Sequence, residues 1–167
     1  MGYNIAGLVI AYNYEKNINK LSQDLKWGIE VTEEITYEIA SANWTPANEF
    51  RLYFSDKATM IFFPHEWVVN QYRSRYFDTL NYAYSETVIA FGFDFFKQGI
   101  LIRSIMEHDG QIKMQRGELL ELEKANPSVS GLTFATINSL LEEDFTRISG
   151  SQIAYRCKKV NFIETDE

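Results

Sequence analysis

The hydrophobic pattern is clearest in the middle of the chain, where residues 86–115 alternate between apolar and polar positions as strands do. Polar turn residues divide this stretch at 97–99 and again at Asp109-Gly110, a dipeptide typical of tight hairpin turns. The alternation therefore predicts a three-stranded antiparallel meander. One face of its first strand is rich in phenylalanine, so another part of the fold has to cover that face.

Two further segments repeat their apolar residues at helical spacing. The repeating positions are Tyr14, Ile18, Leu21 and Leu25 in the first segment and Phe134, Ile137, Leu141 and Phe145 in the second. We expect the first helix to begin at Asn13 and to end at Gly28, and the second to be capped by Thr133. Because the meander needs a cover, both helices are expected to pack on one face of the sheet.

The remaining strands are expected at residues 3–12, 34–40, 50–55, 58–63 and 152–163. Residues 34–40 also fit a helix, but their β-branched and aromatic content favours a strand. The last segment contains Arg156, Lys158 and Lys159, and lysines on a strand are typical of a sheet edge. The long connection 65–82 has no clean period. Because it is rich in aromatics and contains two arginines, it is a candidate binding surface.

The composition fits a packed domain. The chain has 167 residues, of which 46% are hydrophobic and 15% aromatic, which argues against a disordered chain. Length and pattern together predict one α+β domain over residues 1–167. In this fold an antiparallel β-sheet, with the meander in its C-terminal half, carries two amphipathic helices on one face.

The charge is acidic, with a net value of −7, which disfavours nucleic acid as a partner. The acidic excess falls within residues 1–50 and 101–150. The candidate partner-binding residues are Glu30, Glu33 and Glu34 in the first block and Glu142, Glu143 and Asp144 in the second. Such blocks either keep the protein soluble or form an acidic surface that attracts a basic partner protein.

The single cysteine, Cys157, excludes an internal disulfide and a CxxC motif, and its place in an alternating segment indicates a small buried hydrophobe. No apolar run approaches the ~18 residues of a membrane span, and the N-terminus lacks the basic region of a signal peptide. We therefore expect a cytoplasmic protein that does not contact a membrane and holds no cofactor.

Catalytic signatures are sparse. The common phosphate-binding, zinc-protease, calcium and hydrolase motifs do not occur in the sequence. The two histidines, His65 and His108, have acidic neighbours, but adjacent strand residues point to opposite faces, so no metal site is expected. Ser85-Glu86 could meet His108 across the hairpin as a Ser–His–Glu set, although these residues fit ordinary strand ends better.

Arg103 interrupts the apolar meander, and a buried charge has to be paired or to belong to a site. A three-residue turn at 97–99 would place Arg103 on the phenylalanine face, where it could contact an anion or a carboxylate. A two-residue turn would place it opposite Asp94 on the outer face, as an ordinary cross-strand ion pair, and we favour this second arrangement. If the first holds, Glu86, Arg103 and His108 are the candidate residues of a pocket.

The meander also carries a resemblance. Its elements are Ser85-Glu86-Thr87, Phe91, Gly99, Arg103-Ser104, Asp109-Gly110, Gly117-Glu118 and Leu120. This run, within residues 85–120, resembles one found in small bacterial proteins, some of them suspected immunity proteins of polymorphic-toxin systems. The resemblance implies a cytosolic bacterial protein that binds another protein and catalyses nothing. We therefore expect a non-enzymatic binding domain, with a small-molecule-binding or enzymatic domain as the alternative.

Overall fold

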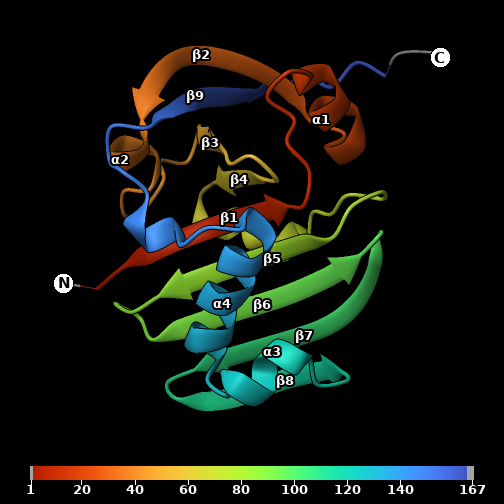
Figure 1. Cartoon of the computed structure of the whole chain (residues 1–167), viewed down its shortest axis with the longest axis vertical. Helices are drawn as coiled ribbons and strands as arrows, with labels where there is room; N and C mark the ends of the chain where they lie inside the picture. Colours follow the sequence, from red (N-terminus) through yellow and green to blue (C-terminus); the bar gives the residue numbers. More distant parts are fainter. Residues whose placement is uncertain (1, 165–167) are drawn as a thin grey trace.

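The computed structural model describes residues 2–164, which form a nine-stranded antiparallel sheet with helices on both faces (Figure 1). The strands are β1 (Asn4–Ile10), β2 (Gly28–Thr36), β3 (Phe50–Phe54), β4 (Thr59–Phe62), β5 (Thr79–Ser85), β6 (Ala90–Lys97), β7 (Ile100–His108), β8 (Gln111–Gly117) and β9 (Ile153–Val160). Their order is β2-β9-β3-β4-β1-β5-β6-β7-β8. The expected α+β class with an antiparallel sheet is confirmed.

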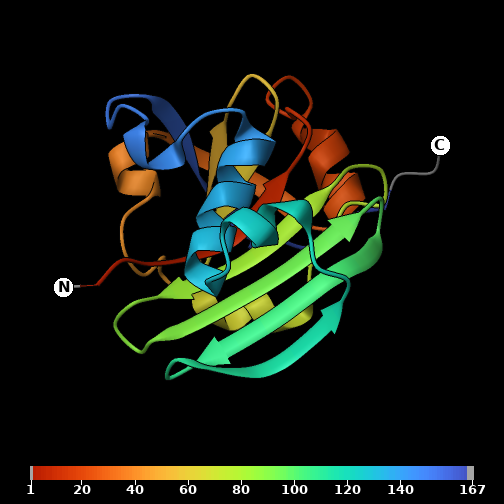
Figure 2. The same cartoon turned by 60° about the horizontal axis from the view of Figure 1, so that its bottom comes forward.

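Four α-helices and two 3₁₀ turns accompany the described part of the sheet. They are α1 (Ile18–Leu25), α2 (Tyr37–Ala40), α3 (Glu121–Ala125), α4 (Val129–Leu141), η1 (His65–Asn70) and η2 (Phe145–Arg147). Figure 2 shows α4 lying across the sheet with α3 beside its start, and α4 contacts β1, β5, β6 and β7.

The two long helices cover opposite faces of the sheet, so the expectation that both pack on one face is wrong. In β1, Ile5 and Val9 belong to the core beneath α4, whereas Leu8 and Ile10 belong to the core beneath α1. The reason lies in β1 itself, because all its residues are buried and a strand that is apolar on both sides needs cover on both sides.

The predicted meander is confirmed as β6, β7 and β8. Its first turn has two residues, Gln98 and Gly99, both with positive φ as hairpin turns of this length require. A β-bulge at Ile102 then shifts the pairing, so that Arg103 lies opposite Phe95 and Asp94 lies opposite Ser104. The favoured Arg103–Asp94 pair is therefore wrong, since one extra residue moves Arg103 to the phenylalanine face despite the two-residue turn.

Several predicted boundaries also move. Helix α1 is capped by Asn17 rather than Asn13, and it ends at Lys26 in the left-handed conformation. Gly28 lies in β2, where a Cβ atom would come within 2.3 Å of the Val160 carbonyl oxygen. Helix α4 begins at the capping residue Ser128, five residues before the expected Thr133. Local periodicity located the helices, but the first usable cap decided where each one starts.

Two predicted strands differ more deeply. Residues 34–40 do not continue as a strand, because β2 ends at Thr36, whose hydroxyl accepts a hydrogen bond from the Ile39 amide and caps the short helix α2. Strand β9, which carries the lysines, is not a sheet edge, since it lies between β2 and β3. Strands β2 and β8 are the edges of the sheet instead.

Candidate functional site

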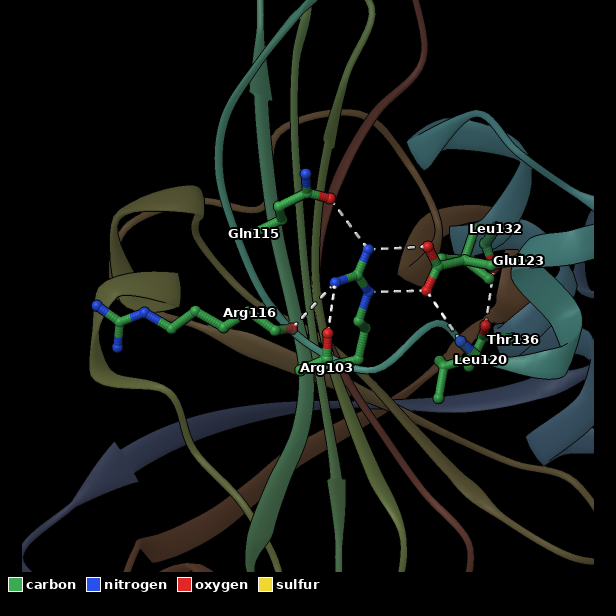
Figure 3. A network of polar contacts seen from close by, with 8 residues as sticks. Arg103, Gln115, Arg116, Leu120, Glu123, Leu132 and Thr136 are labelled. Carbon is green, nitrogen blue, oxygen red and sulfur yellow. Dashed lines mark hydrogen bonds and ion pairs between the residues drawn. The ribbon is translucent and has the colours of Figure 1, made fainter.

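Arg103 is the centre of a buried polar network between the meander and α3 (Figure 3). Its Nε and Nη2 atoms donate to the two carboxylate oxygens of Glu123 at 2.8 and 3.0 Å. Its Nη1 atom donates to the carbonyls of Arg116 and Gly117 at 3.2 and 3.0 Å, and Nη2 also donates to Gln115 Oε1 at 3.2 Å. All five N–H donors of the guanidinium are thus used within the chain.

Local geometry builds this network, which we call the clamp (Arg103, Gln115, Gly117 and Glu123). Gly117 has φ +86°, and a Cβ atom there would lie 1.9 Å from the Ile102 carbonyl oxygen. Only glycine fits this position at the end of β8. At the start of α3, the Leu120 amide donates to Glu123 Oε1 at 3.2 Å. The clamp therefore fastens α3 to the edge of the sheet. The carboxylate that Arg103 binds belongs to Glu123 of the same chain and not to a ligand.

A cavity of about 210 Å³ lies beside the clamp. Its lining consists of Arg103, Ile105, Ile112, Gln115, Leu119, Glu123, Pro127, Ser128, Val129 and Leu132. Neither Glu86 nor His108 belongs to that lining. Since the guanidinium has no donor left over, the cavity offers a ligand mainly apolar contacts.

The structure does not bring Glu86, Arg103 and His108 together as the predicted pocket requires. Glu86 lies exposed in the β5–β6 turn, where hydrogen bonds from the Tyr3 amide (3.1 Å) and then the Tyr84 hydroxyl (2.8 Å) lower the pKa of its carboxyl. His108 is exposed at the end of β7, with its Nδ1 atom 3.4 Å from an Asp109 oxygen. Ser85 donates to Asn4 instead of to a histidine, so the Ser–His–Glu set is also absent from the described hydrogen bonds.

The other titratable candidates have local roles. His65 packs against Trp44 with ring centroids 4.7 Å apart, and burial lowers the pKa of its imidazole. Cys157 is fully buried in β9, as its alternating segment predicts, and burial raises the pKa of its thiol to about 12. Within residues 2–164, no three His, Cys, Asp or Glu side chains gather as a metal-ligand set.

The first acidic block is largely opposed by basic residues on the neighbouring strand. Glu33 forms an ion pair with Arg156, and Glu30 lies directly opposite Lys158 in the β2–β9 register. Glu34 lies opposite Tyr155 instead. Because the basic residues of β9 stand beside the glutamates of β2, this ribbon has little net charge to offer a partner.

The second acidic block (Glu142, Glu143 and Asp144) lies at the C-terminal end of α4. Together with Asp56 of the β3–β4 turn, whose charge acts on the same Tyr53, we call it the acidic corner. Glu143 accepts a hydrogen bond of 2.6 Å from the Tyr53 hydroxyl. Burial, the hydrogen bond to Glu143 and the negative charges of Glu143 and Asp56 together raise the pKa of Tyr53 well above its usual range. Glu143 and Asp56 therefore both act on Tyr53, from the end of α4 and from the β3–β4 turn, and the exposed cations next to them are Lys57 and Arg147.

A groove of about 970 Å³ lies beside α1, and the sequence pattern did not predict it. Its lining comes from α1, from residues 75–76 and from residues 160–164. It includes the basic residues Lys20, Lys26 and Arg75. The one available signal was the aromatic connection 65–82 with its two arginines, and this connection supplies one wall.

None of the helices in residues 2–164 has the length and apolar character needed to cross a membrane. Comparison with protein-family models, curated protein sequences and solved structures finds no match to this chain.

Proposed function

We propose that this chain is a non-enzymatic, immunity-like protein-binding domain whose acidic corner contacts a basic surface of its partner. The observation that carries the proposal is the conformation of Glu142, the residue that ends α4. It adopts φ 57° and ψ 30°, the left-handed region in which helices normally end with glycine. A residue with a side chain costs roughly 1–2 kcal/mol in this conformation.

Electrostatics oppose Glu142 as well. The carbonyl end of a helix carries partial negative charge, so a carboxylate there is unfavourable by about 0.3–1 kcal/mol. Within residues 2–164, no basic side chain forms an ion pair with Glu142 or Glu143. The position thus loses stability in two ways to keep a carboxylate. This is the pattern of a site that gives up stability for function.

The surroundings of Glu142 hold the corner in place. The Tyr37 hydroxyl donates to the Phe145 carbonyl at 2.8 Å, which fastens the chain after the corner to α2. Asp144 accepts a hydrogen bond from the Thr146 amide at 3.0 Å and caps η2. Its ion pair with Arg147 is 3.6 Å long and solvent-exposed, so it cancels little of the charge.

The proposal can be tested by comparing two charge-reversal variants that share one net charge, −3 where the wild type has −7. The E142K/E143K variant removes the corner, and E15K/E66K makes the same change at two exposed residues outside it. Each tagged protein is used as bait in a lysate of the source cell and washed at rising salt. We expect a basic protein that wild type and E15K/E66K retain at low salt, and that E142K/E143K retains about tenfold less.

Two results would contradict the proposal. The first is that the folded wild-type protein retains no basic protein. The second is that both variants lose the retained protein equally, because the attraction would then reflect overall charge rather than the corner.

The E142G substitution separates stability from binding. Glycine relieves the left-handed strain, so we expect the free energy of unfolding to rise by about 1 kcal/mol. Partner retention should fall at the same time. Urea unfolding followed by circular dichroism measures the first effect, and a variant that is less stable than wild type would remove the argument from strain.

A further inference from the structure

We infer that the groove beside α1 binds a small organic anion that carries a planar ring, of the chemical class of a nucleoside phosphate. The inference uses a different surface from the acidic corner and does not depend on the proposed function. It rests on three observations, which are the size and walls of the groove, the state of its basic side chains and an exposed aromatic ring.

The groove has the size and walls of a ligand site. Its volume of about 970 Å³ lies at the upper end of the range for small-molecule sites, roughly 300–1,000 Å³. Its walls are α1, residues 75–76 of the 65–82 connection, and residues 160–164, which begin at the last residue of β9. The Gln23 side chain donates to the Ile163 carbonyl at 3.4 Å and joins α1 to the segment 160–164.

The basic residues of the groove have no carboxylate partners. Within residues 2–164, Lys20, Lys26 and Arg75 form no ion pair. Aromatic rings hold two of them instead: the Lys20 ammonium is 4.2 Å from the ring centroid of Tyr12, and the Arg75 guanidinium is 5.7 Å from that of Tyr76. A ring positions a cation without cancelling its charge, so both charges stay available to an anion.

The lining also contains two carboxylates, Asp24 and Glu164, so its three basic and two acidic side chains leave a net charge of +1. Asp24 is buried and accepts hydrogen bonds from the Tyr14 hydroxyl (2.5 Å), the Ser74 hydroxyl (2.5 Å) and the Arg75 amide (3.1 Å). Its oxygens are thus occupied in fastening the Arg75 segment to α1. Glu164 is exposed at the outer end of the lining.

Tyr76 supplies the surface for a planar ring. Its side chain is 59% exposed, which is unusual for so large a ring. Its backbone is nevertheless fixed, because the Tyr76 amide donates to the Ser74 hydroxyl at 3.0 Å. A base gains affinity by stacking on such a ring, so Tyr76 and the cations around it favour a ligand that has both a ring and negative charge.

The test compares three probes on the whole chain: ADP, inorganic pyrophosphate and adenosine. Binding is measured by calorimetry at low salt for wild type, K20Q/R75Q, Y76A and the control K57Q/K113Q. The control removes two exposed lysines that do not line the groove. The variant K20R/R75K keeps both charges and shows whether a loss in K20Q/R75Q comes from charge rather than from folding.

We expect wild type to bind ADP more tightly than either fragment, because only ADP has both recognised groups. K20Q/R75Q should lower the affinity for ADP and for pyrophosphate by about tenfold or more, and K20R/R75K should keep most of the wild-type affinity. Y76A should lower the affinity for ADP by about fivefold or more and leave the affinity for pyrophosphate within about twofold of the wild-type value. The control should stay within about twofold of wild type.

The inference is overturned if wild type gives no binding heat with ADP at millimolar concentration. It is also overturned if K57Q/K113Q loses as much affinity as K20Q/R75Q, because the protein would then attract anions without a site. If Y76A loses affinity for ADP and for pyrophosphate equally, Tyr76 does not stack on the base, and the inference that the ligand carries a planar ring is overturned.

Discussion

Arg103 in the clamp and Lys20 in the groove are two cations of one acidic protein, held in opposite ways. Arg103 is 5% exposed, and each of its N–H donors reaches an oxygen of the same chain. Lys20 is half-buried, with its ammonium over the rings of Tyr12 and Phe77 and without an ion pair in the described chain.

The difference follows from where each charge lies. A buried charge is tolerated only when it is paired and fully hydrogen-bonded, so the clamp has to use every donor and has none left for a ligand. A charge at the surface keeps its water and needs no carboxylate, so rings can hold it and leave it free to bind. A charged residue within an apolar strand is therefore a weaker indication of a ligand site than a surface charge that has no carboxylate partner.

The largest expected effect comes from breaking the clamp. The E123A substitution leaves the Arg103 guanidinium buried without its carboxylate, so we expect the free energy of unfolding to fall by about 3–5 kcal/mol. Urea unfolding measures the loss. The double variant R103M/E123L removes both charges and should recover most of it. A loss below about 1 kcal/mol in E123A would mean that water replaces the carboxylate and that the clamp is not closed.

A smaller effect is expected from Asp24, the buried carboxylate that supports the groove. D24A leaves the Tyr14 hydroxyl and the Arg75 amide without their acceptor, so the loss of stability should be about 1–3 kcal/mol. D24N, which keeps the size and one acceptor, should lose less. If D24A unfolds at the same urea concentration as wild type, Asp24 does not hold the Arg75 segment, and the groove loses its support.

The smallest effect is expected from Lys20 itself. An exposed cation–ring contact is worth about 0.5–1 kcal/mol, so K20Q should change stability by no more than that. The same substitution combined with R75Q is expected to reduce anion binding about tenfold. If K20Q lost as much stability as E123A, Lys20 would be needed for the fold in the same way as Arg103. The difference between the two regions would then not hold.

The sequence predicted the local elements of the fold well. The meander, the β3–β4 hairpin and both long helices follow from turn residues and periodicity, which act between neighbours in the chain. It predicted their assembly less well. The prediction that both helices pack on one face is wrong because β1 is buried on both sides, so that a helix has to cover each face.

The candidate sites show the same division. Sequence alone identified Glu142 as a candidate partner-binding residue, and it identified the aromatic connection that became a wall of the groove. It could not show that β9 pairs with β2, where Arg156 and Lys158 stand beside the glutamates of the first acidic block. The pairs Glu33–Arg156 and Glu30–Lys158 are 123 and 128 residues apart in the chain, and local pattern carries no information on such distant contacts.

By itself the sequence determined the two long helices, the meander, the β3–β4 hairpin, the acidic balance and the burial of Cys157, because each depends on short-range pattern or on composition. It did not show β5, which begins inside the expected connection 65–82, or most of β2. Only the tertiary structure decided the strand order, the face of Arg103 and the existence of the groove. The physical reason is that a single bulged residue, Ile102, turns a side chain to the other face of a sheet. The groove, likewise, exists only where α1, the Arg75 segment and the chain after β9 meet in space.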